Sequence, residues 1–256
     1  MATRRGQLLD GVLLLDKPEG LSSNHALQRA KRTLDARKAG HAGTLDPFAT
    51  GLLVCCMGRA TKLAGAMLET DKVYEAELCF GEETDSGDLT GLPVGGTGLG
   101  GEAALAIDSA ALEAVLPAFR GEIDQIPPMY SALKRDGKPL YEYARQGIEL
   151  DRPPRRVTIH ELVLLSCGNG KAKVRVACSK GTYIRTLAQD IGRQLGCGAH
   201  LSALRRLTVG PFEVAQAHTL DALQAMEIPS AALIALEALP PGWWPPTTSH
   251  KEETSS

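Results

Sequence analysis

The chain has 256 residues, of which 43% are hydrophobic and 23% charged, and its formal net charge is −2. This length allows one large domain or two small ones with a proper core, so we expect a soluble globular protein. No apolar run approaches the roughly 18 residues that a membrane helix needs, and the first apolar run is too short for a secretion signal, so a cytoplasmic location is expected.

Motifs for metals and cofactors are weak throughout the sequence. The cysteines show no CxxC spacing and the histidines no HxxxH spacing, so reduced core thiols are expected and a metal site is not. Gly96, Gly98 and Gly101 fit GxGxxG, but no strand precedes them and the surrounding segment is acidic. We therefore expect chemistry without a cofactor or a metal.

Charge is distributed unevenly along the chain. Residues 120–206 contain 16 Lys/Arg against 8 Asp/Glu, whereas residues 69–113 contain 11 acids and one lysine. Because screening limits surface charges to about 10 Å, the basic half could bind a polyanion such as RNA despite the negative net charge. Solvated charged faces on both halves are the alternative reading.

In chain order, residues 11–18 predict a buried strand, and Ser22 or Ser23 is expected to cap a helix over residues 26–36. Short strands are then expected at 52–58 and, from its alternation, at Val73–Gly81. The acidic, glycine-rich segment Glu82–Gly101 is predicted to be an exposed loop.

The second half of the chain begins with a predicted helix at 108–121, and an irregular stretch rich in proline, tyrosine and basic residues follows it. A hairpin is expected from 157 to 179, because Asn169 and Gly170 supply its turn, and a helix is expected at 182–196. Irregular alternation of strands and helices, with hairpins, predicts an α+β fold with a mixed or mostly antiparallel sheet and flanking helices.

The stretch GHAGTLDPFATG at residues 40–51 presents a single carboxylate, Asp46, among small residues. Pro47 biases Asp46 toward an extended conformation, and glycines on both sides permit tight turns, so the loop can hold one carboxylate in a fixed direction. Taken alone, an aspartate before a proline more commonly caps a turn or a helix.

The loop does not stand alone, because the whole stretch GHAGTLDPFATGLL closely resembles the catalytic motif of the TruB family of tRNA pseudouridine-55 synthases. Other segments resemble this family in the same order: GVLLLDKPEGLSSN, DKVYEAELCFGEETDSGD, RGEIDQIPPMYSALKRDGKPLYEYARQGIE, CSKGTYIRTLAQDIG and LGCGAHLSALRRL. Agreement of several separated motifs over most of residues 11–210 is far more specific than any one of them.

The resemblance implies a pseudouridine synthase fold, with a catalytic domain at 8–235 and an RNA-clamping insertion at 124–152. It implies an isomerase that flips the uridine at position 55 of the tRNA T-loop out of its stack and converts it into pseudouridine without a cofactor. Asp46 would act on the ribose, either as nucleophile at C1′ or as base toward C2′.

The resemblance also implies partners for Asp46. Arg185 would pair with the carboxylate, Tyr74 would stack on the target base, and Tyr183 and Leu204 would line the pocket. His41 would fill the space that the flipped nucleotides leave in the T-loop. Candidate RNA contacts are the following basic residues: Lys17, which resembles a family lysine near the active site and takes a structural or an RNA-facing role, Lys134, Lys138, Arg145 and Arg152.

Family members usually continue into a C-terminal RNA-binding PUA domain, which is not expected here, because residues 240–256 read as a disordered tail. The expected partner is the T-arm of tRNA, bound by a monomer. Two alternatives remain open: a pseudouridine synthase that acts on another RNA, and a tRNA-binding chaperone.

Overall fold

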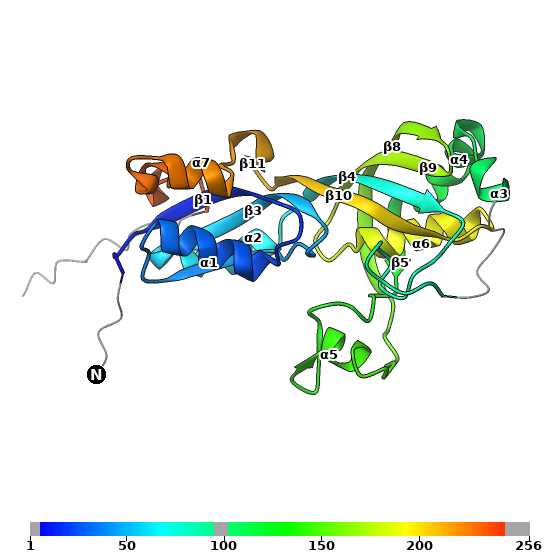
Figure 1. Cartoon of the computed structure of the whole chain (residues 1–256), viewed down its shortest axis with the longest axis horizontal. Coiled ribbons are helices and arrows are strands. Elements are labelled where there is room, and N and C mark those ends of the chain that lie inside the picture. Colours follow the sequence, from blue (N-terminus) through cyan, green and yellow to red (C-terminus); the bar gives the residue numbers. More distant parts are fainter. Residues whose placement is uncertain (1–5, 95–101, 244–256) are drawn as a thin grey trace, which may run out of the picture.

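The computed structural model describes residues 6–94 and 102–243. A nine-stranded sheet runs through the length of an elongated body (Figure 1), in the order β1-β3-β10-β4-β9-β8-β5, with β2 paired to β3 and β11 to β10. The strands are β1 (Gly11–Lys17), β2 (Ala39–Ala42), β3 (Thr50–Met57), β4 (Lys72–Phe80), β5 (Gly121–Gln125), β8 (Arg155–Gly168), β9 (Lys171–Cys178), β10 (Ala199–Val209) and β11 (Phe212–Glu213).

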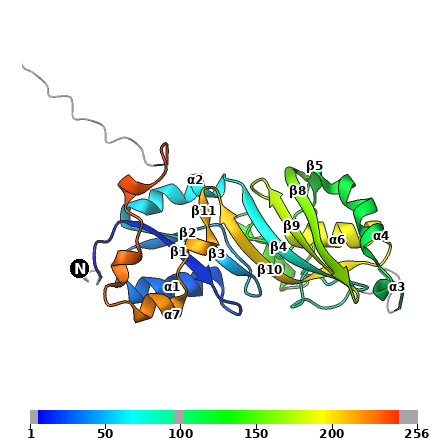
Figure 2. The ribbon, with the colours of Figure 1, turned by 90° about the horizontal axis from the view of Figure 1, so that it is seen from above.

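Pairing within this sheet confirms the predicted fold class. Among the described residues, β10 pairs with β3 in parallel, and the other strand pairs of the sheet are antiparallel. The strands β4 and β10 cross the middle of the body and connect its two halves (Figures 1 and 2).

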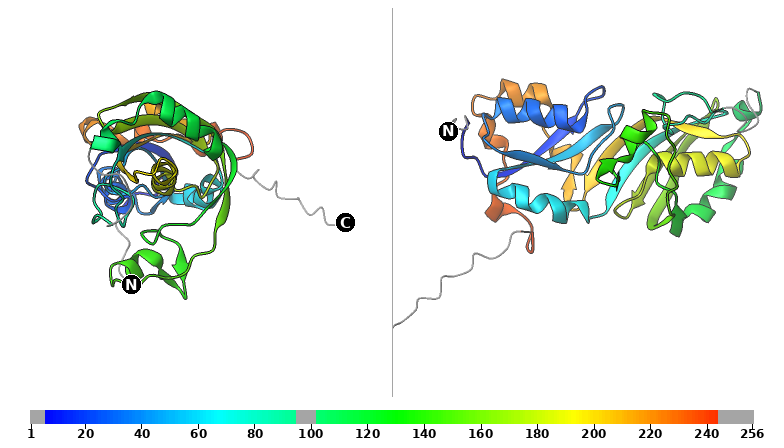
Figure 3. Two further views of the ribbon diagram at one scale, coloured as in Figure 1. Left: turned by 90° about the vertical axis from the view of Figure 1, so that its right-hand side faces the viewer. Right: turned by 90° about the horizontal axis from the view of Figure 1, so that it is seen from below.

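Helices cover the sheet differently in the two halves. In the half that contains both ends of the described chain, α1 (Ser23–Thr33) and α7 (Leu220–Ala225) lie on one face and α2 (Ala64–Leu68) on the other (Figure 2). In the other half the sheet curves around α6 (Ile184–Gln194), as the end-on view of Figure 3 shows. The largest buried cluster forms between α6 and these curved strands.

Several local predictions are confirmed by this structure. Ser22 caps α1 by accepting a hydrogen bond from the His25 amide at 3.2 Å. The hairpin of β8 and β9 turns through Asn169 and Gly170, whose φ angles of 54° and 71° are both positive, as a two-residue hairpin turn requires. The remaining confirmed predictions are β1, β3, β4 and α6.

Other predictions need correction. The helix expected at 108–121 is α4 (Ser109–Val115), after which residues 116–119 tighten into a 3₁₀ turn that contains Pro117. The segment from residue 82 is not simply an exposed loop, because Glu83, Thr84, Ser86 and Asp88 are all buried. Residues 95–101 of this segment, which include the GxGxxG glycines at 96, 98 and 101, lie outside the described residues.

Of the insertion expected at 124–152, Asp124 and Gln125 end β5 within the sheet. The rest leaves the body as a separate lobe (Figure 1), which holds the short strands β6 (Lys134–Arg135) and β7 (Lys138–Pro139) and the helix α5 (Leu140–Ala144). Of the predicted tail, residues 244–256 lie outside the described part of the chain, whereas Trp243 packs edge-on against Phe212 with 5.7 Å between ring centroids. Within residues 6–94 and 102–243, no helix has both the length and the apolar character to cross a membrane.

Candidate active site

A cleft of about 980 Å³ is lined by residues from both halves of the body and from the lobe that carries α5. This volume is at the upper end of the about 300–1,000 Å³ that is usual for ligand pockets. Seven of the residues singled out in the sequence line it: His41, Asp46, Tyr74, Arg145, Tyr183, Arg185 and Leu204.

The loop between β2 and β3 holds Asp46 at the edge of the cleft. The Ser23 hydroxyl fixes its centre, since Ser23 Oγ accepts from the Leu45 amide at 2.7 Å and donates to the Leu45 carbonyl at 2.8 Å. Lys17 Nζ donates to the Pro47 carbonyl at 3.3 Å. These buried contacts hold the backbone on both sides of Asp46, whose side chain remains 34% exposed.

Arg185, at the start of α6, is the cation that faces Asp46. Its Nε lies 3.0 Å from Asp46 Oδ2, while Nη1 and Nη2 donate at 2.7 Å to the carbonyls of Ser86 and Tyr130. The guanidinium is 6% exposed and also lies 3.7 Å from Asp88. Arg185 therefore joins the loop of Asp46, the segment after β4 and the start of the protruding lobe.

Burial raises the pKa of the Asp46 carboxyl above its ordinary value. The positive charge of Arg185 opposes this rise in pKa, whereas the nearby carboxylate of Asp88 adds to it. A carboxylate that is desolvated but paired with a permanently charged guanidinium can remain ionised and reactive near neutral pH.

Aromatic and apolar side chains face the ion pair across the cleft. Tyr74 on β4 is 9% exposed and Leu204 on β10 is 8% exposed, and the two strands pair directly. Tyr183 precedes α6, where its amide donates to Gln125 Oε1 at 3.0 Å and its carbonyl accepts from Gln125 Nε2 at 3.3 Å. Both tyrosines and Leu204 line the cleft that contains the carboxylate, so a planar ring such as a nucleobase could be held beside Asp46.

His41 on β2 lies at another wall of the cleft. Its Nδ1 is buried and has no hydrogen-bond partner among the described residues. Burial lowers the pKa of His41, so a neutral imidazole is favoured at neutral pH. A neutral ring suits packing against RNA bases better than it suits a phosphate contact.

Of the two roles expected for Lys17, the structure favours the structural one and not the RNA-facing one, because the side chain is fully buried. Its ammonium donates to the carbonyls of Pro18, Leu21 and Pro47 at 2.8, 2.7 and 3.3 Å. Burial lowers the pKa of Lys17 to about 8. With its donors directed at these carbonyls, Lys17 supports the loop of Asp46 and is not an exposed RNA contact.

The other candidate RNA contacts lie on the protruding lobe and differ in their surroundings. Lys134 is exposed, Lys138 Nζ lies 4.5 Å from the centre of the Tyr143 ring, and Arg145 lies 5.3 Å from that of Tyr141. Arg152 is only 18% exposed and pairs with Glu149 at 3.0 Å. Arg145 is the member of this group that reaches the cleft.

The basic excess of residues 120–206 is largely neutralised in the folded chain. Lysines 171 and 173 on β9 pair with Glu77 and Glu75 on β4 at 2.7 and 2.5 Å, and Lys180 pairs with Glu69. The acidic and basic blocks of the sequence thus become neighbouring strands, and the basic half is not a uniformly positive face.

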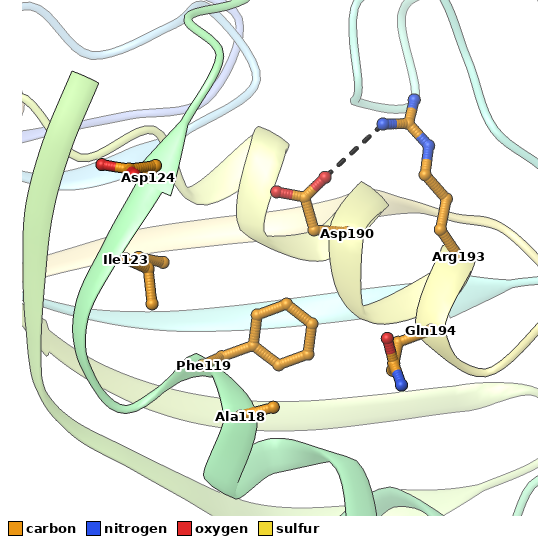
Figure 4. A pocket seen from close by; sticks show the side chains of 7 residues that line it. All are labelled: Ala118, Phe119, Ile123, Asp124, Asp190, Arg193 and Gln194. Atoms are coloured by element: carbon orange, nitrogen blue, oxygen red, sulfur yellow. Dashed lines mark hydrogen bonds and ion pairs between the residues drawn. The ribbon is translucent and has the colours of Figure 1, made fainter. Parts of the chain in front are cut away.

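A second cavity, of about 410 Å³, lies beside β5 and α6. In Figure 4, Asp190 and Arg193 pair on α6 and Phe119 lies on the floor, while Asp124 stands on the strand opposite. Within the described parts of the chain, no group of three or more His, Cys, Asp or Glu residues is placed to hold a metal ion.

Several residues of the site were not predicted from the sequence. Asp88 and Ser86 contact Arg185, Gln125 holds Tyr183, and Arg206 lines the cleft beside Tyr74. Asp88 and Ser86 were assigned to an exposed loop, and no local pattern marks Gln125. Arg206 stood in a recognised segment, SALRRL, but only Leu204 was selected there.

Comparison with known proteins agrees with this fold. A family model described as TruB family pseudouridylate synthase (N terminal domain) matches residues 31–184, and one described as tRNA pseudouridylate synthase B C-terminal domain matches residues 185–236. The chain therefore belongs to the TruB family of pseudouridylate synthases.

Individual relatives extend this result. A tRNA pseudouridine synthase B of Bordetella avium (strain 197N) is 70% identical over 96% of this chain and 100% of the relative. One of Azoarcus sp. (strain BH72) is 58% identical over 86% of this chain and 71% of the relative.

Among solved structures, the chain is similar to one titled "Crystal Structure of a Cbf5-Nop10-Gar1 Complex", with a TM-score of 0.69 and 29% identity over 90% of this chain and 61% of the other. A second, titled "Structure of H/ACA RNP bound to a substrate RNA containing 2'-deoxyuridine", matches with a TM-score of 0.66 and 26% identity, also over 90% and 61%. The chain thus spans less than two thirds of these neighbours.

Proposed function

We propose that this protein converts the uridine at position 55 in the T-loop of tRNA into pseudouridine, with Asp46 acting on the ribose. The observation that carries the proposal is the ion pair of Asp46 and Arg185 at the edge of a cleft lined by Tyr74, Tyr183 and Leu204. Membership of the TruB family and the names of the Bordetella and Azoarcus relatives support the reaction and the class of substrate.

The reaction breaks the bond between N1 of uracil and C1′ of the ribose and forms a bond from C5 to C1′. The proton lost from C5 is balanced by one gained at N1, so no oxidant, reductant or water is consumed. The ionised Asp46 either attacks C1′ or removes a proton from C2′, and Arg185 keeps it charged in both cases. The faces of Tyr74 and Tyr183 would hold the base while it turns.

A uridine stacked in a folded T-loop must leave its stack before it can reach Asp46, at a cost of about a few kcal/mol. We propose that the protruding lobe, with Lys134, Lys138 and Arg145, offsets this cost by binding the RNA backbone. A further group of exposed cations on α1, between α1 and β2, and in the 3₁₀ turn after β3 would extend this contact: Arg29, Arg32, Arg37, Lys38 and Lys62.

We propose that the protein acts as a monomer, because Asp46, Arg185, Tyr74, Tyr183 and Leu204 already form a cleft within one chain. Its six cysteines are free thiols, which agrees with a cytoplasmic location alongside tRNA. Light scattering after gel filtration would measure the oligomeric state.

The direct test incubates the purified protein with an unmodified T-arm minihelix and maps pseudouridine at nucleotide resolution. We expect modification of one T-loop uridine. Modification confined to another RNA would favour a different substrate. Tight tRNA binding without any pseudouridine would favour a chaperone and contradict the proposed reaction.

The role of Asp46 is tested by Asp46→Asn, a change that keeps the size of the side chain and removes its charge. We expect tritium release from 5-labelled uridine in tRNA to disappear, with the Kd for tRNA within about 3-fold of wild type, because only an interaction with the reacting atoms is lost. Asp10→Asn, at an aspartate paired with Arg59 outside the cleft, is the control and should keep full activity. Substantial turnover by Asp46→Asn would contradict the proposed role of Asp46.

A further inference from the structure

Arg206 lies where β10 runs between the two halves of the sheet. Its backbone pairs with Gly51 of β3 on one side and with Tyr74 of β4 on the other. The side chain is 1% exposed, whereas that of the neighbouring Arg205 is 40% exposed and pairs with Asp16 at 2.7 Å. Two consecutive arginines of one strand are therefore one buried and one exposed, which provides a matched pair for experiments.

The guanidinium of Arg206 contacts three separate parts of the site. Nε donates to the carbonyl of Leu52 on β3 at 2.7 Å, and Nη2 donates to the carbonyl of Gly43 at 3.0 Å. Tyr74 is the residue of β4 that pairs with Arg206, and the charge and hydrogen bonding of the guanidinium both lower the pKa of the Tyr74 hydroxyl. Arg206 thus connects the strand after the Asp46 loop, the beginning of that loop and the aromatic ring opposite Asp46.

Gly43 is shaped to admit this contact. Its φ of +80° is one that residues with a side chain rarely adopt, and a Cβ placed there would lie 3.2 Å from Arg206 Nη1. The glycine at the start of the Asp46 loop therefore lets the guanidinium approach the backbone closely. The buried position of Arg206 therefore depends on a residue without a side chain at position 43.

The charge of Arg206 is the feature that a purely structural role does not explain. Its hydrogen-bond partners are the carbonyls of Leu52 and Gly43, neither of which is negatively charged. Burial of a guanidinium without a counter-ion is costly, and a neutral donor could join the same backbone groups. A buried charge that is kept at the cleft, against this cost, indicates a task in the site itself.

We propose that Arg206 is a positioning residue for the reaction, which fixes the hydroxyl of Tyr74 and the start of the Asp46 loop in one rigid frame. Because the guanidinium can only donate, the Tyr74 oxygen can meet it only as an acceptor, which leaves the O–H proton free to turn toward the cleft. This role rests on the proposed function, since it serves the alignment of base and ribose between Tyr74 and Asp46.

The electrostatic surroundings agree with this geometry. Burial raises the pKa of Tyr74, and the positive charge of Arg206 opposes that rise. The same charge adds to the burial that lowers the pKa of His41. Arg206 therefore holds Tyr74 more acidic, and His41 more firmly neutral, than burial alone would.

The test compares Arg206→Lys with Arg205→Lys, which carries the same chemical change on the opposite face of the strand. A lysine keeps the charge but cannot reach all three partners. We expect the single-turnover rate of Arg206→Lys to fall about 100-fold, with the Kd for a T-arm RNA within about 3-fold of wild type. Arg205→Lys should remain within about 3-fold of wild type in both.

A double-mutant cycle with Tyr74→Phe then asks whether Arg206 acts through the tyrosine. We expect the combined rate loss to be clearly smaller than the product of the two single losses. A wild-type rate for Arg206→Lys, a loss confined to Kd, or single losses that multiply in the double variant would each overturn the proposal.

An NMR measurement keeps the proposal testable if Arg206→Lys does not fold. The guanidinium nitrogen resonances of Arg206 should shift in Tyr74→Phe and remain in place in Tyr183→Phe. Unchanged resonances in Tyr74→Phe would refute the contact on which the role depends. Wild-type protein that forms no pseudouridine would count against the proposed function instead, because the NMR result does not require turnover.

Discussion

Arg185 uses three nitrogen atoms on three partners, so a lysine at this position could reproduce at most a part of its contacts. For Arg185→Lys we expect a rate loss of about 100-fold with a modest loss of RNA affinity. The reason is that the single ammonium cannot face Asp46 and also hold the carbonyls of Ser86 and Tyr130. Single-turnover kinetics and filter binding on the same T-arm RNA would measure the two effects.

The pH dependence of the rate provides a second measurement on this variant. The reaction needs an ionised Asp46, whose pKa is raised by burial. On acidification, the wild-type rate should therefore begin to fall at a pH above the ordinary aspartate pKa of about 3.9. Moving the cation away from Asp46 raises this pKa further, and the acidic limb of Arg185→Lys should therefore lie at a higher pH. A limb that stays in place, together with an unchanged rate, would show that the three-way contact is not needed.

Sequence reasoning identified the residues that face the substrate better than the residues that hold them in place. Asp46 and Arg185 were predicted as a pair from the resemblance, and the structure places them 3.0 Å apart. Asp88 and Arg206 were not selected, because their contacts with the site join segments distant in the sequence. For Lys17 a structural and an RNA-facing role were both left open, since burial of a lysine among backbone carbonyls leaves no local mark in the sequence.

At the scale of elements, the segment after β4 behaves as a part of the site. Glu83 is 2% exposed and accepts two hydrogen bonds from Arg193 of α6, at 2.9 and 2.8 Å, so it fastens this segment to the helix that carries Arg185. For Glu83→Ala we expect the free energy of unfolding to fall by about 1–3 kcal/mol and the rate to fall with it, because Ser86 and Asp88 lose their anchor.

Thermal unfolding by circular dichroism, with Glu82→Ala as the control, would test this prediction. Glu82 is the exposed neighbour of Glu83, and its replacement should leave the free energy of unfolding within about 0.5 kcal/mol of wild type. Equal Tm values for Glu83→Ala and wild type would mean that the ion pair does not stabilise this segment.

The central strand β10 illustrates why an element can escape prediction. Its buried residues are Ala199, Leu201, Leu204, Arg206 and Val209, at spacings that alternate between two and three residues. Register shifts after Leu201 and Arg206 interrupt the period of two that identifies a strand. By contrast, β4 alternates without interruption and was predicted to within a residue at each end.

At the scale of the whole molecule, the pairing of acidic and basic strands determines which cations remain to bind RNA. Those on the lobe at 124–152 include Lys134, Lys138 and Arg145, whereas Lys171, Lys173 and Arg175 pair with Glu77, Glu75 and Glu161 across the sheet. Sequence reasoning could identify both sets as basic. It could not distinguish them, because the glutamates that neutralise the second set come close to it only when the strands pair.

The two sets allow a comparison at equal change of charge. Replacing the three lobe cations by glutamine should weaken T-arm binding by about 10-fold to 100-fold and reduce the slope of log K against log salt by about two to three, as expected when phosphate contacts are lost. Replacing Lys171, Lys173 and Arg175 removes the same charge from the outer face of β9, where screening over about 10 Å leaves little effect on the cleft. Titrations at several salt concentrations would measure both triple variants, and equal losses of affinity would mean that RNA responds to total charge, not to the lobe.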